Sequence, residues 1–126
     1  MKEPKKKKYA KLVREFIKGV KMTVGTNYAS RRSVNKNNKG VLAYRAAAEA
    51  IALYYPDRIS DFELLLGHTN RDVRICVGIC LVEIMKCSEE QKAHALKVVA
   101  ACKETSGELD GQGLELWLNR HSEREI

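Results

Sequence analysis

The sequence has few residues that interrupt helices and no pattern that marks a strand. Only two of its 126 residues are proline, and 6% are aromatic. Proline breaks helix interiors, so long helices meet few obstacles here. No alternating apolar and polar run bounded by turn residues occurs. With 44% of residues hydrophobic and few of them aromatic, aliphatic side chains must form most of the core. We therefore predict an all-α fold in a single domain over residues 1–126.

Long apolar runs are also absent. The longest, Ile75 to Val82, has eight residues, whereas about 20 are needed to cross a bilayer. The basic N-terminus is not followed by the apolar stretch of a signal peptide. We therefore expect a soluble, cytoplasmic protein without membrane association, whose four cysteines are reduced thiols.

Motifs of catalysis, cofactor binding and metal binding are missing. The sequence has no GxSxG, no GxxxxGK[ST] and no HExxH. Cys76 and Cys80 lie four residues apart on an apolar stripe, and no pair of CxxC knuckles accompanies them. In such a place cysteine behaves as a small hydrophobic residue. These observations predict a protein that is not an enzyme and uses neither cofactor nor metal.

Helical periodicity of the apolar residues defines the predicted elements. Six helical segments are expected: roughly Lys5 to Met22, Tyr28–Arg32 to Tyr55, Asp61 to His68, Asn70 to about Lys86, Ser88 to about Glu104, and a last one after Gly107. The second contains the weak helix former SVNKNNKG, so a break near Gly40 stays open as an alternative.

Local signals mark several of the predicted helix ends. Ser60 with Glu63, and Ser88 with Gln91, have the spacing of capping boxes. Pro56 stops the second helix. The last helix carries Leu114, Trp117 and Leu118. The tryptophan is interpreted as a cap that seals the end of the core.

Charge is divided unevenly along the chain. Residues 1–45 hold fourteen Lys and Arg against two Glu, a balance of +12, whereas residues 46–126 hold nine against fourteen acids, a balance of −5. No acid occurs from residue 16 to residue 48. At helical spacing the candidate binding residues are Lys7, Lys11, Arg14, Lys18, Lys21, Arg32, Lys36 and Lys39. Such a basic strip could track phosphates; the alternatives are a solvated face or a docking surface for an acidic protein.

Residues 59–86 resemble the unit of HEAT-like repeats. A helix ending in Leu-Leu is followed by a polar turn, Asp72-Val73-Arg74 and an apolar helix. The resemblance implies that Asp72 and Arg74 form polar pairs with neighbouring repeats. The wider chain is similar to a family of small bacterial HEAT-like proteins of unknown function. That similarity rests on the asparagines before Gly40 and on a closing helix with Leu114 and Trp117. It implies antiparallel helix pairs stacked in a short right-handed α-solenoid.

These observations lead to a functional hypothesis. Stacked helical pairs leave a surface that is used for binding. We therefore expect a non-catalytic helical-repeat protein that binds another macromolecule, with a protein, and an acidic one, as the favoured partner. The alternative is nucleic-acid binding through the basic strip of the N-terminal helices.

Overall fold

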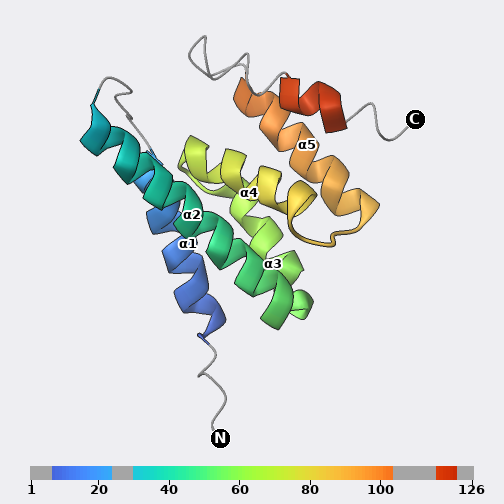
Figure 1. The fold of residues 1–126 in the computed structure, drawn as a ribbon. Coiled ribbons are helices and arrows are strands. Elements are labelled where there is room, and N and C mark those ends of the chain that lie inside the picture. Colours follow the sequence, from blue (N-terminus) through green and yellow to red (C-terminus); the bar gives the residue numbers. More distant parts are fainter. Residues whose placement is uncertain (1–6, 24–29, 104–115, 122–126) are drawn as a thin grey trace, which may run out of the picture. The chain divides into compact units, whose positions relative to one another are not determined.

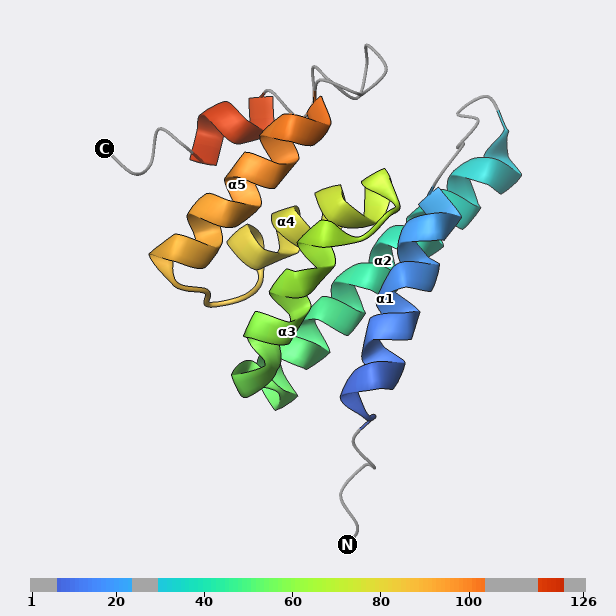
Figure 2. The ribbon, with the colours of Figure 1, turned by 180° about the vertical axis from the view of Figure 1, so that it is seen from behind.

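The computed structural model describes residues 7–23, 30–103 and 116–121, which are mostly helical and include no strand. The all-α prediction is therefore confirmed for this part of the chain. Contacts divide the chain into two compact units, residues 1–62 and 63–126. Figures 1 and 2 show the helices of each. No described helix is long and apolar enough to cross a membrane.

The first unit is built on two antiparallel helices, α1 (Tyr9–Thr23) and α2 (Arg31–Tyr54), which lie side by side in Figure 1. The helix expected from Lys5 begins instead at Tyr9. The fully buried Phe16 packs edge-on against Phe62, with ring centroids 5.1 Å apart. The rest of this core is aliphatic: Leu12, Val20, Ala47, Ala48, Ile51 and Ile59.

A glycine pair lets α1 and α2 approach closely. Gly40 and Gly19 are both buried where the two helices cross. A Cβ atom on Gly40 would lie 2.5 Å from the carbonyl oxygen of Gly19, and one on Gly19 would lie 2.8 Å from that of Gly40. The break considered near Gly40 does not occur, and α2 is continuous. Close packing against α1 outweighs the roughly 1 kcal/mol by which glycine disfavours a helix interior.

The ends of α2 follow local rules. The hydroxyl of Ser30 accepts a hydrogen bond from the Ser33 N–H at 3.3 Å, as an N-cap residue does. At the other end the Tyr55 N–H donates to the Ile51 carbonyl at 2.8 Å. Pro56 then opens a 3₁₀ turn, Pro56–Arg58, so the predicted stop is confirmed.

The next element differs from its prediction. The expected helix from Asp61 to His68 is a short α3 (Ile59–Glu63) followed by a 3₁₀ turn (Leu64–Gly67). The proposed capping box is wrong, because Ser60 lies inside α3 and does not precede it. The chain already turns from Pro56 onward, since proline suits the first position of a helical turn.

The second unit pairs α4 (Arg71–Glu83) with α5 (Glu89–Lys103). The Asn70 side chain caps α4 by accepting from the Val73 N–H at 3.1 Å. The predicted capping box of α5 is confirmed in both directions. Gln91 N–H donates to the Ser88 hydroxyl at 3.1 Å, and Ser88 N–H donates to the Gln91 side chain at 2.9 Å.

The core of the second unit is aliphatic and contains two of the cysteines. Of the two cysteines predicted to pack in the core, Cys80 is buried and Cys76 is partly buried, and Cys102 is buried as well. Residues 116–121 form a further helical turn, from which Trp117 and Leu118 pack on the cluster of Ile75, Val99 and Cys102. The tryptophan therefore covers this core, as expected. Leu114 lies outside the described residues.

Candidate interaction surface

One face of α2 is exposed along almost its whole length. Its members recur every three or four residues, which places them in one row on the helix surface. The row, called here the α2 face, consists of Arg31, Asn35, Lys39, Leu42, Ala46, Glu49 and Leu53, all exposed. From first to last residue it extends about 33 Å at 1.5 Å per residue.

The two halves of the α2 face differ in chemistry. Its first half is cationic and amide-bearing, and its second half carries Leu42 and Leu53, which are 71% and 70% exposed. Glu49 is the only acid of the row. Single exposed leucines are common on protein surfaces. Here Leu42 and Leu53 lie about 16 Å apart on one helix face, with Ala46 and Glu49 between them, and they adjoin a cationic stretch.

A hollow of about 630 Å³ lies beside the cationic half of the α2 face. It is lined by Met22, Arg31, Arg32, Asn35, Lys36 and Lys39. Four of these six residues are cations and none is an acid. The positive end of the α2 dipole lies at the same place, because the lining includes the first turn of the helix. The surface of the hollow itself is formed almost entirely by apolar atoms, so the aliphatic stems of these side chains line it and their exposed charged ends border it. An anionic group is therefore favoured at the rim of the hollow.

The structure brings together only part of the predicted basic strip. Arg32, Lys36 and Lys39 line the hollow, whereas no cation of α1 does. Lys7 precedes α1 and is paired with Glu15 at 2.8 Å. The other predicted cations of α1 are exposed opposite its buried stripe: Lys11, Arg14, Lys18 and Lys21. One continuous strip across both helices remains a prediction.

Sequence reasoning missed several members of this surface. Arg31 lines the hollow, and Leu42 and Leu53 were not singled out. The spacing of Arg31, Asn35 and Lys39 with Leu42 and Leu53 was present in the sequence. The sequence left open a break at Gly40, and these residues share one face only if the helix is continuous through that position.

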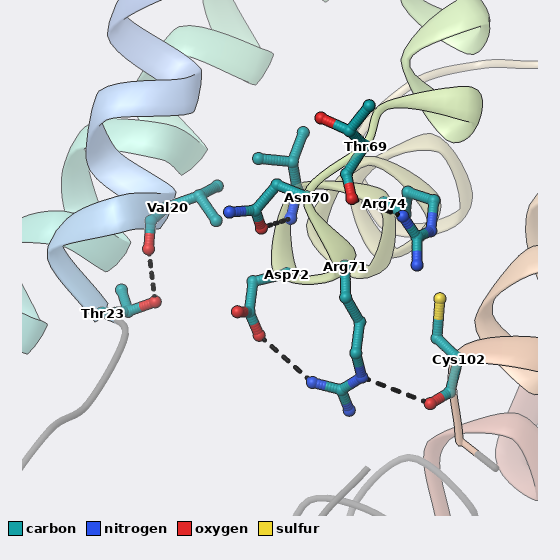
Figure 3. Close-up of polar contacts among 9 residues, drawn as sticks. Val20, Thr23, Thr69, Asn70, Arg71, Asp72, Arg74 and Cys102 are labelled. Atoms are coloured by element: carbon teal, nitrogen blue, oxygen red, sulfur yellow. Dashed lines mark hydrogen bonds and ion pairs between the residues drawn. The ribbon is translucent and has the colours of Figure 1, made fainter. Parts of the chain in front are cut away.

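Asp72 and Arg74 make contacts close to their own positions, as Figure 3 shows. The Asp72 carboxylate lies 3.4 Å from the guanidinium of Arg71, which also donates to the Cys102 carbonyl. Arg74 donates to the carbonyls of His68 and Thr69 at 2.8 and 3.0 Å, and so holds the turn before α4. A stacking role for this pair remains a prediction.

The reactive side chains of the second unit are engaged in packing and hydrogen bonds. The Cys87 thiol donates to the Leu81 carbonyl at 3.2 Å, and burial raises the pKa of this thiol. A raised pKa keeps the sulfur protonated and weakly nucleophilic at neutral pH. His94 Nδ1 lies 2.7 Å from the Glu63 carboxylate, to which Gln91 also donates. Among the described residues, no group of three or more His, Cys, Asp or Glu side chains could hold a metal ion.

Comparisons with known proteins give no match, so a function can be inferred only from the fold and the surface described above. No family model, curated protein or solved structure matches the chain.

Proposed function

We propose that this chain is a non-catalytic protein-binding module whose α2 face contacts an acidic partner protein. The observation that carries the proposal is the division of one exposed helix face into a cationic half and a mainly apolar half, in which Glu49 is the one charged residue. Protein interfaces combine a few apolar anchors with a polar border. The HEAT-like stacking inferred from residues 59–86 belongs to this proposal. The antiparallel pairing of helices within each unit supports it.

The apolar half supplies the test. Leu42→Glu and Leu53→Glu should each weaken binding of the partner about 30-fold, since an interface anchor contributes about 2 kcal/mol. The assay is a quantitative pull-down from the native host, with circular dichroism to confirm folding. Leu64→Glu is the matched control, because Leu64 is 75% exposed and lies outside the α2 face. Equal recovery of partners by all three variants would refute the proposal.

Nucleic-acid binding is the second candidate function. It is favoured by the exposed cations Lys11, Arg14, Lys18 and Lys21 of α1, for which the described part of the chain supplies no ion-pair partner. About five phosphate contacts on duplex would give a slope of roughly −4 to −5 for log K against log salt. The triple variant of Lys11, Arg14 and Lys18 to Glu should then abolish binding. No binding at about 50 mM salt and micromolar protein would eliminate this candidate.

A further inference from the structure

The hollow and the α2 face form one continuous surface. Arg31, Asn35 and Lys39 belong to both. An occupant of the hollow therefore lies in line with Leu42 and Leu53 farther along the same helix. The cationic stretch from Arg31 to Lys39 extends about 12 Å, and the apolar stretch from Leu42 to Leu53 about 16 Å.

The charges around the hollow are unfavourable in the free chain. Helix dipoles favour acids in the first turn, whereas the first turn of α2 has none and begins with Arg31 and Arg32. Lys36 follows Arg32 by four residues and precedes Lys39 by three, so like charges are neighbours on the helix surface. An anionic group at the rim of the hollow would offset both repulsions.

We infer that the α2 face binds an amphipathic helix of the partner protein whose acidic end contacts the cations at the rim of the hollow and whose apolar residues cover Leu42, Ala46 and Leu53. The inference rests on the proposed protein-binding function and specifies the partner segment. A helix that spans the whole face has about 22 residues, given 33 Å at 1.5 Å per residue. Its carboxylates belong at one end, and its apolar residues recur at i, i+3, i+4 and i+7 at the other.

The apolar half separates this occupant from a nucleic-acid strand. A phosphate backbone is bound through cations and hydrogen-bond donors along its length. Over the second half of the face, Leu42, Ala46 and Leu53 supply neither, and the carboxylate of Glu49 would repel a phosphate. The cations that border the hollow would suit a phosphate or a carboxylate, but the surface as a whole matches a segment that is acidic at one end and apolar at the other.

Site-specific photo-crosslinking in the native host tests this arrangement. The photoreactive residue benzoylphenylalanine replaces Asn35 or Ala46 of the full chain, both exposed on the α2 face. Leu64, exposed outside that face, is the control position. Mass spectrometry then identifies the cross-linked segments. Circular dichroism verifies that each variant folds.

Both positions should capture the same segment of one protein. The two captured points should lie about 11 residues apart, because Asn35 and Ala46 are 11 residues apart and a helix that runs alongside α2 has the same rise per residue. Acids should lie within two turns of the point captured from Asn35. Changing Arg32 and Lys36 together to Glu should reduce that cross-link at least tenfold.

Capture of a segment without acids, or of nucleic acid, from Asn35 would overturn the inference. Capture of a protein from Ala46 would in that case leave the proposed function standing. Absence of any protein from both positions would remove the inference and the proposed function together.

Discussion

Substitution of Gly40 by alanine tests the close approach of α1 and α2. In an isolated helix this change stabilises by about 1 kcal/mol. Here the added Cβ would lie 2.5 Å from the Gly19 carbonyl oxygen, 2.8 Å from the Cβ of Met22 and 3.0 Å from a methyl of Thr23. The shortest of these distances is about 1 Å less than an ordinary contact. The nearest atom belongs to the backbone, so no side-chain rotation relieves the overlap.

The expected magnitude follows from two opposing terms. Overpacking costs typically 1–3 kcal/mol, and the upper end applies because two helix backbones must separate. Subtracting the helix-propensity gain of about 1 kcal/mol leaves a net destabilisation of about 2 kcal/mol. For a slope of about 2 kcal/mol per molar urea, the unfolding midpoint should fall by about 1 M. Equilibrium unfolding followed by far-ultraviolet circular dichroism measures this shift.

Two other glycines calibrate the result. Gly67→Ala places its Cβ in open space and should change stability by less than about 0.5 kcal/mol. Gly78→Ala meets a methyl of Val99 at 2.5 Å and should have an intermediate effect, because that side chain can move. A Gly40→Ala variant as stable as the original chain would show that the helices do not require this contact.

The remaining predictions concern the second unit. Leu81 is fully buried, so Leu81→Ala should destabilise by about 2–5 kcal/mol in urea unfolding. Leu64 is exposed, so Leu64→Ala should lower the free energy of unfolding by less than about 0.5 kcal/mol. Similar losses for Leu81→Ala and Leu64→Ala would contradict the assigned core. Because burial raises the pKa of Cys87, the unfolded chain loses this proton first as pH rises. The protonated Cys87 thiol therefore makes its full contribution to the free energy of unfolding below about pH 8.5, and this contribution is lost as the pH rises above that value. The stability advantage of the original chain over Cys87→Ala should therefore shrink from pH 8 to pH 10, and a constant or growing difference would refute this assignment.

The sequence by itself determined the fold class and the elements whose signals are local. The apolar periodicity of residues 9–20 required a helix with Phe16 on its buried side, and α1 has that form. The pair Ser88 and Gln91 specified the start of α5, because both hydrogen bonds of a capping box close within four residues. Trp117 was interpreted as a cover for the core, because a large apolar side chain in a closing helix needs burial.

The tertiary structure decided what depends on contacts between distant residues. Continuity of α2 through Gly40 depends on Gly19, 21 residues earlier, and helix propensity alone contains no information about that partner. The pattern that correctly predicted a capping box at Ser88 gave a wrong prediction at Ser60. There the 3₁₀ turn that starts at Pro56 leads directly into α3, so Ser60 lies inside the helix. The hollow and the α2 face exist only when α2 is unbroken and α1 lies beside it. Residues of Arg, Lys and Leu type were visible in the sequence. Their arrangement as one surface follows from the packing of two helices, which is a property of the folded chain.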